Sequence, residues 1–450
     1  ISCEVKSDKI VVTPKSADVE CMALVYADTK TGLTSIVKLL FEKEICKVVA
    51  PAEGYVVDFE NGTVEVNVVS NIPFEVKPQA DWLHYVSTKA TSYTVTITAD
   101  NNTVAEPRTG IVNIVRAGTD DVLQTIEIAQ KPLDPSINLS KKESANCYLI
   151  SKAGQYKFAT VKGNSAESVG SVASAAIVWE TWNNTETVTA GSVIASLEYD
   201  GGYIKFATPE TLKCGNALIA AKDANGVILW SWHIWVTDMA IEGIDCGHAG
   251  ETLVMNCNLG AIDVPGTNGG FGLQYQWGRK DPFMGCGSLG HSDLSTVCGT
   301  EMTLTTDLLS EDDARQNPTL FYHVGSNGKD WFAGSASDRW AESKTVNDPC
   351  PAGWRAARST DNSVFLLSGG TVADMETYTF TADGVVFPFS GTIYYESGSF
   401  DKSDTIYHLA DDYNTTTPKG WRVKSSSGSR TAVRKASGGA VRCVAVSAVE

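Results

Sequence analysis

Hydrophobic and polar residues alternate with a period of two along most of the first 132 residues. Five such runs, each with apolar side chains at about every second position, are 55–59, 63–68, 93–98, 111–115 and 124–128. Turn-forming pairs such as Asn61-Gly62 and Asn101-Asn102 lie between the runs. Because alternation indicates strands with one buried face, short strands at this spacing predict a β-sandwich over 48–132. The segment 131–135, which holds two prolines, then marks its end.

Residues 1–47 carry shorter runs of the same kind. They are too few to form an independent core, since burial is marginal in chains below about 40–50 residues. We therefore expect a small or incomplete β domain that packs against the sandwich.

Residues 136–240 continue the β pattern with more aromatic side chains. The turn Asp223-Ala224-Asn225-Gly226 joins the apolar runs 216–222 and 227–235, and its Asn-Gly pair favours a hairpin because it adopts positive φ angles. Both faces of the second run are apolar, which is typical of a strand buried on both sides. We expect a β-rich domain here, with His233 as a buried histidine rather than a ligand.

Residues 245–450 mix helical patterns with short strands and long loops. Ser310 precedes the stretch 311–315, which ends before Pro318, and this pattern predicts a short capped helix. A second helix is predicted over 360–367, ended by Gly369-Gly370. The segment is therefore predicted to be an α+β domain.

Composition limits the partners and the compartment. The chain has 450 residues, 43% of them hydrophobic, as in soluble proteins of about two to four domains. Its net charge of −17, with no basic stripe, argues against a nucleic-acid partner, because phosphate binding needs clustered Lys and Arg. No run of about 18 apolar residues could span a membrane. The chain begins Ile1-Ser2-Cys3, so we expect that an export signal has been removed and that any outer-membrane attachment is through that signal or a lipid anchor.

The eleven cysteines show no Cys-x-x-Cys pair and no Cys/His cluster at zinc spacing. Most of them can be small buried hydrophobic residues. Cys350 lies between two prolines before a predicted short helix, and Cys443 lies on an alternating run near the end of the chain. This arrangement suggests that the two pair and close the last domain on itself. Such a bond persists in oxidising compartments, which would place the protein outside the cytoplasm.

Several short motifs within 48–132 together resemble the BACON domain. They are Ile72-Pro73-Phe74-Glu75-Val76, Asp81-Trp82-Leu83, Asn101-Asn102, Arg108-Thr109-Gly110 and Thr125-Ile126-Glu127-Ile128-Ala129-Gln130. The resemblance implies an immunoglobulin-like module, frequent in exported proteins of Bacteroidetes-type bacteria. It also implies binding of carbohydrate or mucin, or a role as a spacer. We interpret Trp82 as a residue of the sandwich core.

Four motifs within 245–450 also form a recognisable set. They are Met255-Asn256-Cys257-Asn258-Leu259-Gly260-Ala261, Tyr275-Gln276-Trp277-Gly278-Arg279-Lys280-Asp281-Pro282-Phe283, Asp348-Pro349-Cys350-Pro351-Ala352-Gly353-Trp354-Arg355 and Val441-Arg442-Cys443-Val444. The set resembles the fibrobacter-type major paralogous domains and related fimbrillin-associated surface proteins, whose fold is similar to the C-type lectin-like fold. In that fold a Cys before the first helix pairs with one on the last strand, which implies Cys350 with Cys443. Cys246 with Cys257 and Cys286 with Cys298 remain conceivable pairs.

No catalytic or metal-binding motif is present. The sequence lacks nucleophile elbows, His-Glu-x-x-His, phosphate loops and dinucleotide fingerprints. The 245–450 segment also lacks the Glu-Pro-Asn or Gln-Pro-Asp loop that presents oxygen ligands to calcium in lectins. We therefore expect no catalytic residue, no metal and no cofactor. Acidic pairs such as Glu311/Asp312 and Asp411/Asp412 are interpreted as solvated faces, with the carboxylate pair of a glycosidase as the alternative.

Aromatic residues are the remaining candidates for a binding site. Trp331, Trp340, Tyr394 and Tyr395 lie beside Gly, Ser and Asn, where their rings could stack on a sugar. The alternative is that each packs under a long loop, and Trp354 and Trp421 are expected to be core residues.

The sequence therefore predicts a multidomain, mainly β protein with immunoglobulin-like β-sandwich modules followed by an α+β C-type lectin-like domain. We expect an exported protein at the cell surface, outer membrane or periplasm of a Gram-negative bacterium. It would recognise a glycan or a mucin-type glycoprotein through 245–450 without catalysis. The alternative is a structural or accessory subunit of a surface fibre or glycan-uptake system with surface-protein partners only. A glycan-active enzyme is the third hypothesis.

Overall fold

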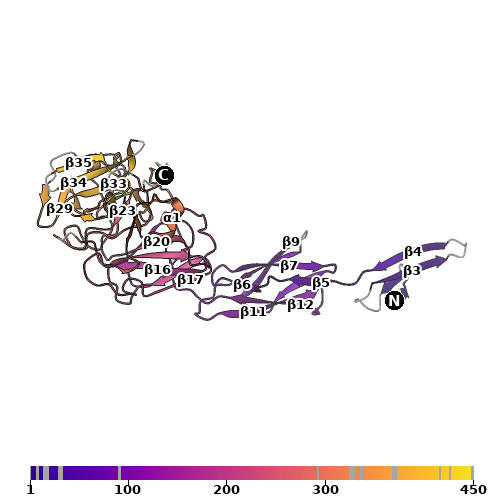
Figure 1. The fold of residues 1–450 in the computed structure, drawn as a ribbon. Coiled ribbons are helices and arrows are strands. Elements are labelled where there is room, and N and C mark those ends of the chain that lie inside the picture. Colours follow the sequence, from indigo (N-terminus) through magenta and orange to yellow (C-terminus); the bar gives the residue numbers. More distant parts are fainter. Residues whose placement is uncertain are drawn as a thin grey trace. The chain divides into compact units, whose positions relative to one another are not determined.

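The computed structural model of the chain is mainly β and divides into two compact units (Figure 1). It describes residues 2–6, 10–13, 20–28, 34–89, 93–290, 293–323, 330–334, 338–366, 372–414, 417–424 and 427–446. The first unit is Ile1–Pro135 and the second is Ser136–Glu450. The division falls at the end of the proline-containing segment 131–135.

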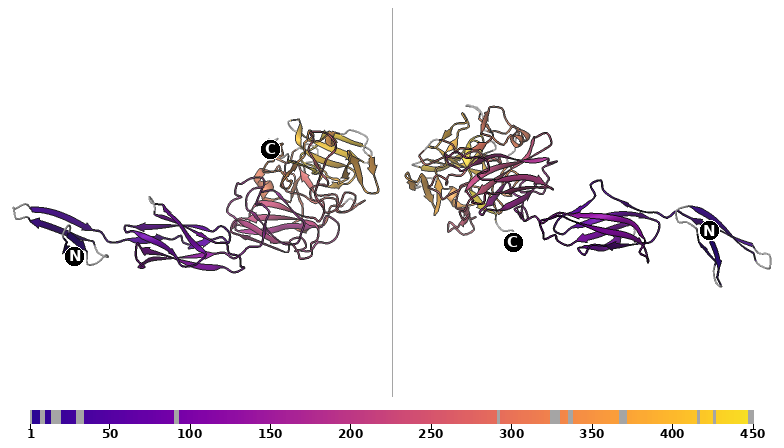
Figure 2. Two further views of the ribbon diagram at one scale, coloured as in Figure 1. Left: turned by 180° about the vertical axis from the view of Figure 1, so that it is seen from behind. Right: turned by 90° about the horizontal axis from the view of Figure 1, so that it is seen from below.

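The first unit begins with two separate hairpins. Strand β1 (Ser2–Val5) pairs with β2 (Ile10–Thr13), and β3 (Cys21–Asp28) pairs with β4 (Thr34–Phe41). Figure 2 shows the β3–β4 hairpin (indigo) as a two-stranded ribbon. None of the buried apolar clusters in the described residues includes a side chain from these four strands. This arrangement is consistent with an incomplete domain, because a lone hairpin has too little apolar contact to be stable by itself.

The rest of the first unit is a sandwich of two four-stranded sheets. One sheet has the order β5 (Cys46–Val49), β7 (Thr63–Ser70), β10 (Thr94–Ala99), β9 (Leu83–Lys89). The other has the order β6 (Tyr55–Val57), β12 (Val122–Gln130), β11 (Arg108–Arg116), β8 (Phe74–Pro78). Alternate side chains of both sheets, such as Val66, Ile97 and Ile114, are fully buried between them, as the alternation predicts. Trp82 is half-buried and packs against this core from its margin, with the Arg108 guanidinium 4.3 Å from its ring.

The second unit contains two sheets built mainly from its first hundred residues, with β24 as a later edge strand. A five-stranded sheet has the order β14 (Cys147–Ile150), β20 (Ile228–Val236), β19 (Gly215–Lys222), β16 (Ser174–Thr181), β24 (Cys298–Gly299). A four-stranded sheet has the order β13 (Ile137–Asn138), β15 (Gln155–Ala159), β18 (Tyr203–Ala207), β17 (Ser196–Asp200). The predicted hairpin joins β19 to β20, with Gly226 at a φ of +81°.

Both faces of β20 are buried, as predicted. Trp232 on one face packs against Phe158, with the ring centroids 5.0 Å apart, and Trp235 belongs to a second buried cluster. His233 is buried with its Nε2 2.7 Å from Asn216 Oδ1. The second cluster also contains Tyr275 and Trp277, so the predicted domains 136–240 and 245–450 share one core. Residues after 245 therefore pack against the second face of β20 and bury it.

Residues 241–446 add short strands around this core. One four-stranded sheet has the order β21 (Gly243–Ile244), β22 (Val254–Met255), β37 (Cys443–Ala445), β27 (Trp354–Ala356). A larger sheet has the order β32 (Phe400–Asp401), β31 (Thr392–Ile393), β36 (Gly438–Ala440), β33 (Thr405–Asn414), β34 (Thr417–Lys424), β35 (Ser427–Ala432), with β23 (Gln274–Gln276) paired to β36. The remaining strands are β25 (Thr303–Thr305) with β26 (Leu320–Tyr322), and β28 (Val372–Asp374), β29 (Thr379–Ala382), β30 (Val385–Pro388).

Helices are short in the described part of the chain. The predicted helix at Ser310 is α1 (Glu311–Gln316), and the Ser310 and Asp313 side chains form its capping box. The helix predicted over 360–367 is a 3-10 helix at Ser363–Leu366, and Leu367 and Gly369-Gly370 lie outside the described residues. The short helix expected after Cys350 is instead strand β27, because Arg355 pairs with Val444 of β37. Within the described residues of 245–450, the expected α character is thus limited to α1 and this 3-10 helix.

Candidate functional site

A disulfide joins Cys350 to Cys443, as predicted, with 6.2 Å between their Cα atoms. The buried Asp348 carboxylate fixes the backbone around it, because it accepts hydrogen bonds of 2.9 Å from the amides of Cys350 and Ala356. The other pairs that the sequence left open are not formed. Cys246, Cys257, Cys286 and Cys298 are not in disulfide bonds.

Trp331 and Trp340 do not form a binding surface in this structure. Their exposed fractions are 0% and 1%. The indole N–H of Trp331 donates to Trp277 O at 2.7 Å, and that of Trp340 donates to Asn347 O at 2.9 Å. Both indoles bury their rings and satisfy their N–H groups on backbone carbonyls, so neither presents a face to a ligand. Trp421 is also fully buried, as expected for a core residue.

Tyr394 and Tyr395 remain accessible, on a tight loop that follows β31. The amide of Tyr394 donates to Ser399 O and the amide of Gly398 donates to Tyr394 O, both at 2.8 Å. Gly398 has a φ of +67°, which favours glycine at this turn. The loop therefore carries two consecutive, half-buried tyrosines on a defined backbone, and Tyr395 packs against the buried cluster that contains Trp331.

Charged side chains surround this tyrosine pair. The Tyr394 hydroxyl lies 3.4 Å from Asp404 Oδ2, and Arg422 Nε donates to Asp404 Oδ1 at 2.7 Å. The Tyr395 hydroxyl donates to Glu396 Oε1 at 2.7 Å, and the Arg434 guanidinium lies 5.7 Å from the Tyr395 ring.

Both phenols are neutral at neutral pH, as tyrosines ordinarily are, and their surroundings raise their pKa further. Burial raises the pKa of Tyr394, and the hydrogen bond to Glu396 raises the pKa of Tyr395. The two tyrosines therefore offer partly exposed rings and hydroxyls, with the exposed Glu396 carboxylate beside Tyr395, which suit a polyhydroxylated ligand.

The acidic pairs considered as glycosidase candidates have structural partners. Asp312 accepts from Arg315 at 2.7 Å, Glu311 faces Arg339, and Asp411 accepts from the Ser359 amide and hydroxyl. The side chain of Asp412 lies outside the described residues. Across the described ranges, no group of three or more His, Cys, Asp or Glu side chains could hold a metal ion. No helix in the described ranges is long and apolar enough to cross a membrane.

The sandwich carries a polar hollow that the sequence reading missed. Asn61, Thr63, Thr98, Asp100 and Asn101 line an open hollow of about 500 Å³. Asn61 has a φ of +52°, and its amide donates to Asn101 Oδ1 at 3.0 Å. Asn61 and Asn101 contribute polar side chains to this hollow, but in the sequence the pairs Asn61-Gly62 and Asn101-Asn102 predict only turns.

Comparison with known proteins gives one family match. Residues 73–131 match the BACON family model, described as "Putative binding domain, N-terminal". No curated protein matches the chain.

Several solved structures are weakly similar to the chain. A Bacteroides ovatus GH5 xyloglucanase in complex with a XXXG heptasaccharide is 17% identical over 22% of this chain and 21% of that chain, with a TM-score of 0.19. The SGBP-B of a Bacteroides ovatus mixed-linkage glucan utilization locus is 13% identical over 48% and 54%, with a TM-score of 0.15. SporoSAG from Toxoplasma gondii is 13% identical over 41% and 93%, with a TM-score of 0.24.

At these TM-scores the likenesses carry no argument about this chain. None of the comparisons bears on the predicted C-type lectin-like domain at 245–450. The family match, in contrast, covers three of the four strands of the second sheet (β8, β11 and β12) and two of the four strands of the first sheet (β9 and β10). A BACON domain therefore occupies residues 73–131 of this chain.

Proposed function

We propose that the protein is an exported, non-catalytic carbohydrate-binding protein of a bacterial cell surface, and that Tyr394 and Tyr395 form part of its sugar-binding face. The observation that carries the proposal is that these two consecutive tyrosines, on a hydrogen-bonded loop, are only partly buried. The exposed Glu396 carboxylate beside Tyr395 can accept hydrogen bonds from sugar hydroxyls, whereas Asp404 is buried and paired with Arg422. The BACON domain supports a binding role, and the Cys350–Cys443 disulfide supports an oxidising compartment.

A glycan array that includes mucin-type glycans tests this proposal. The full chain is expected to bind a restricted set of glycans, and the double variant Tyr394→Ala/Tyr395→Ala is expected to lose that binding. Tyr199→Ala is the matched control, because Tyr199 is also half-buried but lies on β17. If the full chain binds none of the glycans at about millimolar concentration, the proposal is contradicted.

A second candidate function is a structural or accessory role with protein partners only. The β3–β4 hairpin favours it, because Met22, Leu24, Ile36, Val37 and Leu40 are 47–68% exposed. Exposed apolar clusters of this kind are typical of interaction surfaces. Cross-linking and pull-down from the native surface separate this function from glycan binding. Leu40→Lys is the test variant, and Val122→Lys on the sandwich is the control.

A further inference from the structure

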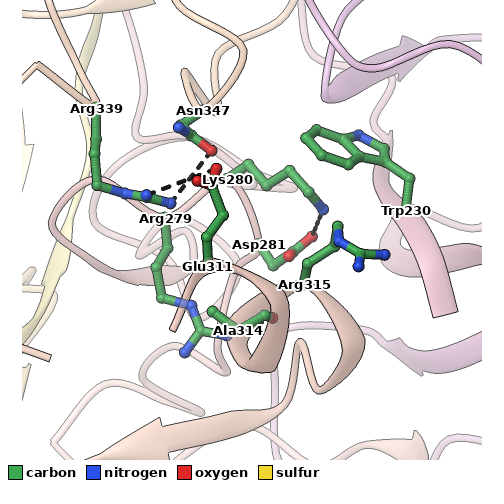
Figure 3. Close-up of a pocket in the computed structure, with 9 residues that line it drawn as sticks. All are labelled: Trp230, Arg279, Lys280, Asp281, Glu311, Ala314, Arg315, Arg339 and Asn347. Carbon is green, nitrogen blue, oxygen red and sulfur yellow. Dashed lines mark hydrogen bonds and ion pairs between the residues drawn. The ribbon is translucent and has the colours of Figure 1, made fainter. Parts of the chain in front are cut away.

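A small hollow in the second unit is lined mainly by basic side chains. Figure 3 shows Arg279, Lys280, Arg315 and Arg339 gathered around it, with Asp281 and Glu311 as the acidic residues of the lining. The hollow encloses about 20 Å³, which is room for one or two ligand atoms and not for a sugar ring. The gathering is unusual in a chain with a net charge of −17.

Two of the four basic groups have close carboxylate partners. Lys280 Nζ donates to Asp281 Oδ1 at 2.6 Å and to Ser231 Oγ at 2.6 Å. Arg315 donates to Asp312 Oδ1 at 2.7 Å. These two ion pairs neutralise one side of the hollow.

The other two basic groups, Arg279 and Arg339, have acidic neighbours, but neither donates a described hydrogen bond to a carboxylate. The hydrogen bonds described for Arg279 all go to carbonyl oxygens, such as Leu320 O at 2.7 Å. Arg339 donates to Gly278 O at 2.9 Å and to Asn347 Oδ1 at 3.3 Å. Its Nη1 lies 3.8 Å from Glu311 Oε1, which is beyond hydrogen-bond range.

Burial makes this charge excess costly. Arg279 and Arg339 are only 2% and 7% exposed. Burial lowers the pKa of Arg279 to about 10 and also lowers the pKa of Arg339. A buried cation without a bonded anion is destabilising, so an anion that reached Arg339 would be bound favourably.

Glu311 lies where such an anion would bind, but its carboxylate is too far from Arg339 for a hydrogen bond. Figure 3 shows its side chain reaching from α1 toward the Arg339 guanidinium. Its side chain is 60% exposed, so it can leave the hollow at little cost. Glu311 therefore competes weakly with an external anion for Arg339 at the mouth of the hollow.

We propose that this hollow binds the carboxylate of an acidic sugar, which displaces Glu311 and pairs with Arg339 beside Asn347. The proposal rests on the proposed carbohydrate-binding function and names acidic sugars as its ligand class. Only the carboxylate oxygens enter the hollow, because its volume is small, and the sugar ring stays outside. The guanidinium of Arg339 can hold both carboxylate oxygens once Glu311 has moved.

Titration of the full chain with D-glucuronate and with neutral D-glucose tests the proposal by calorimetry. We expect glucuronate to bind and glucose not to bind at this site, with acetate as a competitor of glucuronate. Glu311→Gln removes the competing carboxylate and is expected to tighten glucuronate binding by about tenfold. Asn347→Asp places a fixed carboxylate near Arg339, and this variant is expected to bind glucuronate at least about tenfold more weakly.

Glu301→Gln is the matched control, because this exposed glutamate lies outside the lining and its loss changes the net charge equally. Equal glucuronate affinities in the wild type, Glu311→Gln and Asn347→Asp, or no binding in Glu311→Gln, would overturn the proposal. Binding of neutral glycans that still depends on Tyr394 and Tyr395 would then leave the proposed function standing. Loss of all glycan binding would overturn both.

Discussion

Ala356 and Cys443 lie opposite each other in the ladder between β27 and β37, and Cys443 is also bonded to Cys350, which precedes the same strand. The strand pairing and the disulfide therefore hold the same two segments together. The covalent bond closes a long loop of the second unit, with a sequence separation of 93 residues.

Replacing Cys350 and Cys443 by serine is expected to lower the free energy of unfolding by about 2–5 kcal/mol, because the unfolded chain gains freedom when the loop opens. Urea unfolding with and without reductant measures this. Cys246→Ser, at a free and half-buried cysteine, is the control. An unfolding midpoint that reductant does not change would contradict the role of the bond.

Burial of His233 predicts a loss of stability in acid. Burial lowers the pKa of His233 to about 3, and the Nδ1 atom of the buried ring makes no hydrogen bond. As the pH falls below about 6.5, the unfolded state takes up a proton that the folded state does not. The stability is therefore complete above about pH 6.5 and is lost progressively toward pH 3, by about 2 kcal/mol at pH 5.

Urea unfolding at pH 7 and pH 5 checks this prediction. In His233→Gln the fall in stability between the two pH values is expected to be smaller than in the wild type by about 2 kcal/mol. His248→Gln, at a half-exposed position, is the matched control. An equal fall in His233→Gln and the wild type would show that this histidine does not set the acid sensitivity.

Trp340 and Tyr394 are expected to respond differently to substitution by alanine. Trp340 lies in the core, 5.9 Å from the Trp277 ring, so Trp340→Ala should cost about 3–5 kcal/mol of stability. Tyr394 is half-buried, and Tyr394→Ala should cost about 1 kcal/mol. Thermal and urea unfolding measure both, and a Trp340→Ala variant as stable as the wild type would contradict the assignment of Trp340 to the core.

Local signals predicted much of the fold. Alternation located the strands of the sandwich, Asn225-Gly226 located the β19–β20 hairpin, and Ser310 located the start of α1. Each of these features depends on residues that are close in the sequence, which is why the pattern sufficed.

Long-range packing decided what the sequence could not predict. The segment after Cys350 is a strand because it pairs with β37, and Trp331 is buried because it packs in a cluster with Tyr322 and Ala436, where Trp277 O accepts its N–H. The surroundings of Arg339 likewise depend on Glu311 and Asn347, which come from separate segments of the chain. A tryptophan beside Gly and Ser in a loop has the same local pattern whether its ring is covered or exposed.

Binding of glycans by the wild-type chain and by the Tyr394→Ala/Tyr395→Ala variant tests the central claim most directly. The account predicts that the wild type binds a restricted set of glycans and that the double variant binds them at least about tenfold more weakly, while unfolding at a similar urea concentration. Equal binding by the two proteins, or no glycan binding by the wild type, would contradict it.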